Sequence, residues 1–192
     1  GDGDGFQVLL DAVGDLQQDV GAFGDRGRAP TLTHGMGGIQ RGFDIGGGNK
    51  VTFNQPGRES IALNRVTGLR GSNIQGMLNA NGQVFLINPN GVLFGQGARV
   101  DVAGLVASTL NLSNQDFLDG KMQFNAGDTA GAVRNAGAIT TGRGGQVLLI
   151  APDVENSGII TTPNGEVMLA AGRSVQLADP ANPSLQVVLS AP

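Results

Sequence analysis

Short apolar runs, separated by Gly, Asn and Pro, dominate most of the chain, and the clearest pair lies within residues 81–97. The two runs, VFLI and VLF, are rich in β-branched and aromatic residues, which favour strands. Between them stand Asn88, Pro89, Asn90 and Gly91. Proline fixes φ near the value that the second position of a turn requires, asparagine tolerates the left-handed region, and glycine removes the Cβ penalty. This stretch is therefore predicted to form a strand, a tight turn and a second strand.

Similar alternations predict earlier strands at residues 39–45, 50–53 and 60–63. Glycine and proline at 46–48 and 55–57 mark the turns between them. These short, regularly punctuated elements indicate an all-β chain.

Residues 1–30 carry a different pattern. Apolar residues between Phe6 and Val20 fall roughly on one helical face, but Gly14 weakens a helix and the run FQVLL equally suits a strand. The aspartates of this segment lack the ligand spacing of an EF-hand, so a solvated acidic leader is favoured over a calcium site. We therefore divide the chain into an atypical N-terminal leader or cap, residues 1–30, and a single repetitive domain, residues 31–192.

Two segments near the C-terminus repeat each other. Asn135 recurs as Asn156, and Val147 recurs as Val167. These pairs define a period of about 20–21 residues, and a constant period of this kind indicates stacked structural units. Val84 joins the series, because it precedes Val147 by three such periods.

A unit of about 20 residues with two or three short strands cannot bury its own apolar face, but stacked units bury that face between them. At about 3.3 Å per residue it is long enough for one coil of a parallel β-helix, with coils about 4.8 Å apart. Val84, Val147 and Val167 would then occupy equivalent inward positions. A leucine-rich repeat is disfavoured because its L-x-x-L-x-L pattern is missing, and a β-sandwich would not explain the period.

Three further segments complete the pattern. Residues 98–112 alternate small and apolar side chains and are predicted to add one or two coil faces, whereas the more polar residues 114–124 predict an excursion, either a surface loop or a small flap. Residues 185–189 predict a final strand. Because an open coil edge invites pairing, we expect the chain to be the N-terminal part of a longer protein.

Composition narrows the function classes. The chain has 192 residues, a net charge of −4 and singly scattered arginines, which disfavours nucleic acid as a partner. No apolar run reaches about 18 residues, so no membrane-spanning helix is expected. There is no Cys, and His34 is the single histidine, so neither a metal nor another cofactor is expected. A chain without Cys also suits export in an unfolded form through an oxidising compartment.

No catalytic constellation stands out, although parallel β-helices also carry polysaccharide lyases and hydrolases. The available polar residues are Asp101, Asp116, Asp119, Lys121 and Asp128. Glycan cleavage would need paired carboxylates facing one groove, and no Asp-rich motif repeats across the coils. We therefore expect no enzymatic activity. An adhesive module that binds a host or matrix ligand remains an alternative, since a flat sheet face needs no motif.

Four motifs together carry a resemblance to a known family: VTFNQP (51–56), IALNRVTG (61–68), SNIQGMLNANGQVFLINPNGVLFG (72–95) and GLVAST (104–109). In this order and spacing the chain resembles, over about residues 31–177, the two-partner secretion (TPS) domain at the N-terminus of filamentous-haemagglutinin-like exoproteins. The NPNG element is a hallmark of that family. Residues 1–30 do not resemble the usual start of its mature domain.

The resemblance implies a right-handed parallel β-helix with an N-terminal cap and a few extra-helical antiparallel strands, and the period of about 20–21 residues would be one coil. It also implies a secretion signal that crosses the periplasm and is recognised by the POTRA domains of a dedicated outer-membrane β-barrel transporter of the Omp85 type. The exoprotein would be secreted or displayed at the cell surface, and we expect the domain to be a monomer.

The family motifs supply two groups of candidate recognition residues: Asn64, Arg65 and Thr67 in the first, and Asn88, Pro89, Asn90 and Gly91 in the second. One hypothesis is that the extended NPNG segment pairs with a strand edge of the transporter before folding. The other is that NPNG forms a coil corner whose asparagine side chains bond the adjacent turn. Arg65 would either contact the partner or tie down the cap.

Overall fold

A computed structural model describes residues 31–33, 38–40, 42–177 and 187–190. The leader 1–30, with its ambiguous helix or strand, and His34 lie outside these residues. Within the described part, the one helix is the five-residue α2 (Asn114–Leu118), and no helix there is long and apolar enough to cross a membrane.

Most strands form three parallel sheets, two of them six-stranded and one four-stranded. Sheet A contains β1 (Thr31–Thr33), β3 (Lys50–Asn54), β6 (Met77–Ala80), β9 (Arg99–Val102), β14 (Ala138–Thr141) and β17 (Ile159–Thr161). Sheet B contains β2 (Gly38–Gln40), β4 (Ile61–Val66), β7 (Gln83–Ile87), β10 (Gly104–Ser108), β15 (Gln146–Ala151) and β18 (Glu166–Ala171). Sheet C contains β5 (Ser72–Ile74), β8 (Val92–Phe94), β13 (Val133–Asn135) and β16 (Val154–Asn156).

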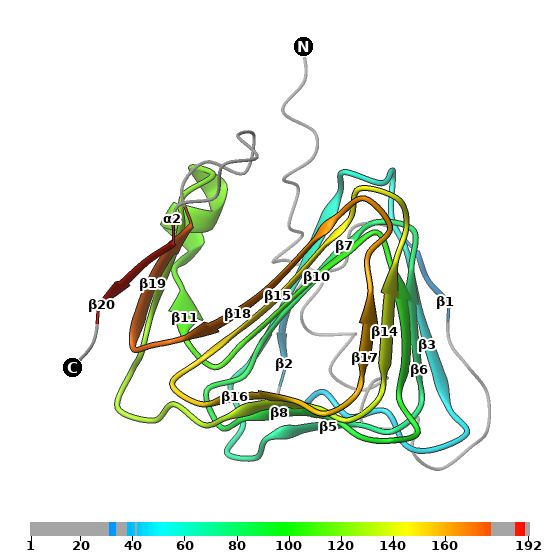
Figure 1. The fold of residues 1–192 in the computed structure, drawn as a ribbon, viewed down its shortest axis with the longest axis horizontal. Coiled ribbons are helices and arrows are strands. Elements are labelled where there is room, and N and C mark those ends of the chain that lie inside the picture. Colours follow the sequence, from blue (N-terminus) through cyan, green and yellow to red (C-terminus); the bar gives the residue numbers. More distant parts are fainter. Residues whose placement is uncertain (1–30, 34–37, 41, 178–186, 191–192) are drawn as a thin grey trace.

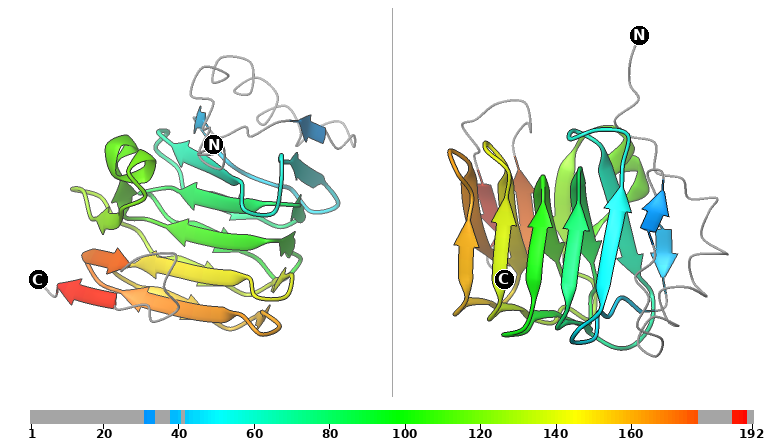
Figure 2. Two further views of the ribbon diagram at one scale, coloured as in Figure 1. Left: turned by 90° about the horizontal axis from the view of Figure 1, so that it is seen from above. Right: turned by 90° about the vertical axis from the view of Figure 1, so that its right-hand side faces the viewer.

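The chain visits the three sheets in turn, so that β6, β7 and β8 make one coil and β14, β15 and β16 make a later one. Seen down the stack, the coils superimpose as a triangle, and the side views show their strands lying one above another (Figures 1 and 2). The predicted fold class, an all-β parallel β-helix, is confirmed. The predicted strand at 39–45 is shorter than expected, because β2 ends at Gln40 and Ile45 makes only an isolated bridge to Ile74.

The register confirms the period for most coils. Val84 pairs with Leu105, one period of 21 residues further along the chain. Val147 pairs with Val167, one period of 20 residues further along. Leu105, however, pairs with Val147, which is two periods further along the chain. The three periods from Val84 to Val147 therefore span two steps of the stack, where the sequence repeat suggested three.

The first hydrophobic core fills the interior of the triangle. Val84, Leu86, Val147 and Leu149 are all 0% exposed and belong to this column of apolar side chains. Val167 occupies the equivalent place in the last coil but is 46% exposed. Burial in the column thus depends on having a coil on both sides.

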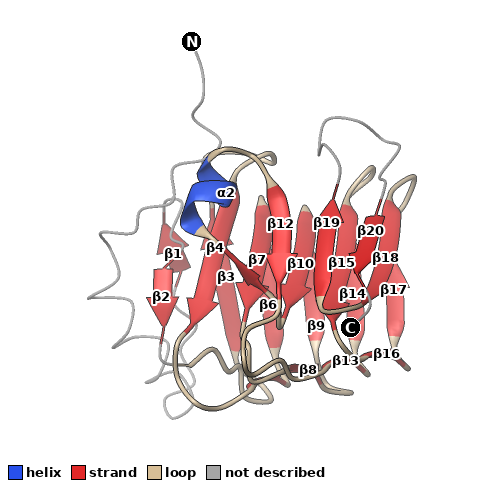
Figure 3. Cartoon of the chain, turned by 90° about the vertical axis from the view of Figure 1, so that its left-hand side faces the viewer, coloured by secondary structure: helices blue, strands red, loops and turns tan. Residues whose placement is uncertain are grey.

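The extra period of chain between β10 and β13 forms a flap over sheet B. The flap comprises β11 (Asn111–Leu112), α2 and β12 (Met122–Asn125), and it joins the C-terminal strands β19 (Ser174–Leu177) and β20 (Val187–Ser190) in the antiparallel sheet D. Figure 3 shows this sheet and α2 standing in front of sheet B. The predicted excursion and the extra-helical antiparallel strands are confirmed, as is a final strand near residue 187.

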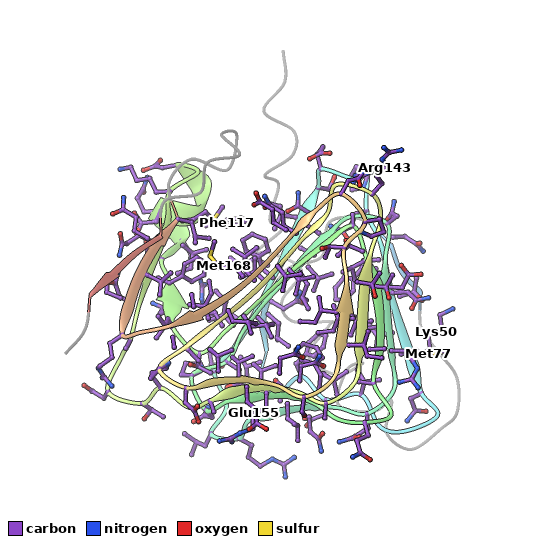
Figure 4. All side chains as sticks on the ribbon, in the orientation of Figure 1. Lys50, Met77, Phe117, Arg143, Glu155 and Met168 are labelled. Carbon is purple, nitrogen blue, oxygen red and sulfur yellow. The ribbon has the colours of Figure 1, made fainter. Side chains whose placement is uncertain are left out.

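A second hydrophobic core lies between sheet B and the flap. Phe85 and Ile87 point away from the triangle into it, and Phe117 of α2 is 1% exposed and meets the Phe85 ring edge-on, with 6.0 Å between centroids. Figure 4 shows Phe117 and Met168 in this space. The excursion is therefore a packed element with its own core, which a surface loop would lack.

Glycines occupy corners where successive coils approach closely. A Cβ on Gly137 would lie 2.6 Å from the carbonyl oxygen of Gly95, and one on Gly158 would lie 2.2 Å from that of Gly137. Only a residue without a side chain fits such contacts. This requirement accounts for part of the high glycine content, 33 of 192 residues.

Alanine at position 137 tests this stacking. We expect Gly137→Ala to lower the free energy of unfolding by about 1–3 kcal/mol, because the added methyl group overlaps backbone atoms of the neighbouring coil. Gly142→Ala is the matched control, since a Cβ there meets nothing within 4 Å. Urea denaturation followed by circular dichroism measures both. Equal midpoints for the two variants would contradict the tight corner.

Candidate functional site

The NPNG residues form the corner between sheets B and C. β7 ends at Ile87, the chain turns, and β8 begins at Val92, with the N–H of Gly91 donating to the carbonyl of Asn88 at 3.1 Å. The predicted strand, turn and strand are confirmed. The left-handed position is Gly91, with φ of 127°, and Asn90 keeps a negative φ, contrary to the role that its tolerance suggested.

The Asn88 side chain is completely buried, and both its amide nitrogen and its amide oxygen form hydrogen bonds. Its Nδ2 donates to the carbonyl of Arg70 and to Oγ of Ser72, both at 3.0 Å. Its Oδ1 accepts the backbone N–H of Asn90 at 3.0 Å, which closes an Asx turn. Asn88 therefore joins its own corner to the turn one coil earlier.

Asn90 makes a second tie to the same turn. Its Nδ2 donates to the carbonyl of Gly68 at 2.7 Å and to Oδ1 of Asn88 at 3.2 Å. The carbonyl of Pro89 accepts the N–H of Gly131 at 2.7 Å, which links the corner to the next coil. These bonds are the arrangement expected of a structural coil corner.

The other candidate residues lie beside this corner in β4. Asn64 pairs with Leu86 and Arg65 pairs with Ile87, so the two motif groups, which are about one coil apart in sequence, come together in space. Asn64 is 0% exposed, faces the triangle, and donates from Nδ2 to the carbonyls of Ala62 and Phe85 at 3.1 and 3.3 Å. Thr67 follows the strand and is exposed.

Arg65 points to the opposite face, toward the flap. Its guanidinium donates to the carbonyl of Leu112 and, at 2.6 Å, to Oδ1 of Asn114. Partial burial lowers the pKa of Arg65 from its ordinary value. The sequence predicted that Arg65 contacts the partner or ties down the cap. Its described contacts are instead with the flap, and the N-terminal cap lies outside the described residues.

Removing this tie should loosen the flap. Arg65→Met should lower the free energy of unfolding by about 1–3 kcal/mol, because it leaves the buried Leu112 carbonyl without its donor. Lys50→Met, at an exposed position on the outer face of sheet A, is the control. Hydrogen exchange of the β11 and β12 amides would rise in the first variant only. Unchanged protection would show that Arg65 does not hold the flap.

The residues weighed for catalysis are divided between distant elements. Asp101 lies on the outer face of β9 in sheet A, whereas Asp116 belongs to α2 in the flap. Lys121 lies 4.0 Å from Asp119, a loose exposed ion pair. Within the described ranges no three acidic or histidine side chains are grouped closely enough to hold a metal ion.

The structure adds partners that the sequence pattern did not single out. Gly68, Arg70 and Ser72 receive the hydrogen bonds of the NPNG asparagines. The sequence spacing could have identified these partners, since each one precedes the asparagine that it bonds by 16 to 22 residues, about one coil. The site is thus a two-coil unit made of the turn at 67–71 and the corner at 88–91.

The stacked coils, the extra-helical sheet and the NPNG corner define the class of this protein, a parallel β-helix with a flap over one of its sheets. The family model of the TPS secretion domain matches residues 41–191, and the chain belongs to this family. The family resemblance of the sequence motifs is confirmed. A TPS secretion domain implies export of an exoprotein across the outer membrane with a transporter as partner.

Similar proteins come from Haemophilus influenzae. A "Heme/hemopexin-binding protein" is 42% identical over 139 residues, which cover 68% of this chain and 15% of that protein. A second protein of the same name is 48% identical over 84 residues, 44% of this chain and 9% of its own length. The crystal structure of the HMW1 secretion domain superimposes with a TM-score of 0.79 and 34% identity, covering 85% of this chain and 45% of that one. The chain therefore spans a small part of the curated relatives that it matches.

Proposed function

We propose that residues 31–192 are the secretion signal of a larger exoprotein, recognised by the POTRA domains of an Omp85-type outer-membrane β-barrel transporter. The domain acts as a monomer without a cofactor, crosses the periplasm, and starts β-helix folding of a protein that is secreted or held at the cell surface. The family match to the TPS secretion domain carries this proposal. The haem and hemopexin binding in the relatives' names concerns proteins of which the match covers 15% and 9%, and it is not part of the proposal.

The NPNG corner supports a role beyond the repeat. Positions equivalent to Asn88 in the later coils are Thr109, Ala151 and Ala171, as the register of sheet B shows. The strand before the corner is common to all coils, whereas the asparagines belong to one. A signal that must be read once in the chain is expected at such a singular position.

The burial of the asparagines indicates in which state of the chain the transporter can contact their side chains. Asn64 and Asn88 are 0% exposed in the folded domain, so a partner reaches their side chains only in an extended chain. An extended 83–94 segment offers two apolar strands, and strand addition to a sheet edge of the transporter would use their backbone groups. Folding then transfers the same groups to the neighbouring coils.

The last coil supports the proposed start of further folding. Val167 and Leu169 of β18 are 46% and 47% exposed, and Ile159 of β17 is 68% exposed. A further coil stacked on them would bury apolar surface and add ladder hydrogen bonds. Stacking of this kind outside the membrane would favour outward movement of the chain.

Deletion tests the function directly. Export of the exoprotein into the medium or onto the cell surface should be lost when residues 31–192 are removed, and it should be retained when a downstream segment of equal length is removed. Immunoblotting of culture medium, surface fractions and periplasm measures the distribution. Continued export without residues 31–192 would favour the adhesive alternative, in which this domain binds a host or matrix ligand and can be removed without blocking secretion.

A further inference from the structure

We propose that Leu69, together with Arg70, is the contact through which the folded domain binds its transporter, and that the NPNG asparagines hold this contact in place. The inference rests on the proposed function. It assigns the folded domain a recognition element different from the asparagines themselves, which are occupied by internal hydrogen bonds once the coil has formed.

Leu69 is the most exposed large apolar side chain among the described residues, at 93%. The exposed apolar residues of the last coil are explained by their having a described coil on one side only, and Met77 and Leu93, at 47% and 38%, lie on the outer faces of strands. Leu69 belongs to no strand and lies within the stack, in the turn between β4 and β5. Neither explanation covers it.

The backbone on each side of Leu69 is fixed by the corner. The Gly68 carbonyl accepts from Asn90 Nδ2 at 2.7 Å, and the Arg70 carbonyl accepts from Asn88 Nδ2 at 3.0 Å. Further along the same turn, the N–H of Ser72 donates to the carbonyl of Gly91 at 2.9 Å. Because the 68–69 and 70–71 peptide groups are both held, the backbone between them keeps the leucine side chain directed toward water. A preorganised apolar side chain loses little conformational entropy on binding.

Arg70 defines the chemistry of the partner. Its side chain is 88% exposed, and the nearest carboxylate, Asp44, lies 3.9 Å away at a half-exposed position. An exposed pair of this length contributes little, so the guanidinium is free to exchange Asp44 for a better partner. Arginine beside a large apolar side chain is typical of interface anchors. The fitting surface on the transporter is an apolar pocket with a carboxylate at its rim.

The transporter is the occupant that the geometry favours over a host ligand. The bonds that fix Leu69 come from the NPNG corner, the element that one coil alone carries and that the proposed function assigns to secretion. The transporter would then recognise the same part of the chain, the turn at 67–71 and the corner at 88–91, first when it is extended and again when it is folded. The extended chain presents the asparagines, and the folded chain presents Leu69 and Arg70.

Binding of the folded 192-residue chain to the full-length transporter in lipid nanodiscs tests the inference. We expect Leu69→Ser to raise the dissociation constant at least tenfold, and Arg70→Gln to raise it less and chiefly at low salt. Leu93→Ser, which removes the same side chain from the outer face of β8, should bind as the wild type does. Because both leucines are exposed, circular dichroism and melting temperature should match the wild type in every variant.

Two results would overturn the inference: absence of binding by the wild-type folded chain, or equal binding by Leu69→Ser. Loss of cell or matrix adhesion in Leu69→Ser with unchanged transporter binding would also overturn it and assign the turn to a host ligand. Export of the wild-type exoprotein separates the two proposals. If the transporter exports it while Leu69→Ser binds normally, only the inference fails; if the transporter does not export it, the proposed function fails.

Discussion

Replacing Asn88 with leucine should lower the free energy of unfolding of the domain by about 2–4 kcal/mol, through the loss of buried hydrogen bonds. Leucine is close to asparagine in size but offers no hydrogen bonds, so the Arg70 carbonyl, the Ser72 hydroxyl and the Asn90 N–H all lose their partner, a side chain with no exposure. Each unsatisfied buried polar group costs about 1–3 kcal/mol, and partial access of water to the turn reduces the sum. Urea denaturation of the purified chain, followed by circular dichroism, measures the change.

Asn90→Ala is the milder companion, since the half-buried Asn90 side chain has one bond to the turn at 67–71. We expect it to cost about 1 kcal/mol and to leave the domain folded. If the asparagines are also read in the extended chain, export of Asn90→Ala should fall although the melting curve barely changes. A loss in Asn88→Leu below about 0.5 kcal/mol, the ordinary effect of a surface substitution, would contradict the structural role of the corner.

Truncating Phe117 should destabilise the domain by about 3–5 kcal/mol, the range for a phenylalanine removed from a packed core. Its ring is 1% exposed and belongs to the second core, where it packs edge-on against Phe85. Phe117→Ala should expose the outer face of sheet B, and the newly exposed apolar surface should bind more of a hydrophobic dye. Thermal and urea denaturation give the size of the effect.

Leu93→Ala is the control for this truncation, because it shortens an apolar side chain that is 38% exposed on the outer face of sheet C. It should change stability by no more than about 0.5 kcal/mol. If Phe117→Ala were equally mild, the flap would be a loosely attached surface element and the second core would contribute little to stability.

The coil and the corner were predictable because both leave local signals. Strand-forming runs with glycine and asparagine between them repeat with a nearly constant period, and stacking is the physical consequence of that spacing. The burial of Val84 and Val147 follows from it. The turn itself also follows, but the residue with the positive φ does not, because asparagine tolerates that region as well and only the structure assigns it to Gly91.

The sequence predicted the flap only as an interruption of the coil repeat and did not predict its strand pairing. Its strands β11 and β12, which pair with each other, are two and four residues long. The other partner of β12, β19, is distant in sequence, so no local pattern could identify that pairing. One signal was present: β7 and β15 read VFLI and VLLIA without polar alternation, which is typical of strands covered on both faces. A second layer over sheet B accounts for those runs.

The sequence could not predict the environments of Asn64 and Arg65, because these depend on which face of sheet B each side chain occupies. Successive residues of a strand point to opposite faces, so a shift of one register position would exchange the two. The pairing with β7 places Asn64 over Leu86 in the interior and Arg65 over Ile87 beneath the flap. Sequence motifs identified the pair, and only the sheet register assigned one to the core and the other to the flap.

The pairing of β12 with β19 also sets an order of events in folding. Asn125 at the end of β12 pairs with Ser174 at the start of β19, 49 residues later, and the strands β13 to β18 lie between them in the chain. In a chain that is delivered N-terminus first, sheet D remains incomplete until those coils have formed. The second core is then completed only when β19 reaches the flap, after the chain of the coils through β18 has been delivered.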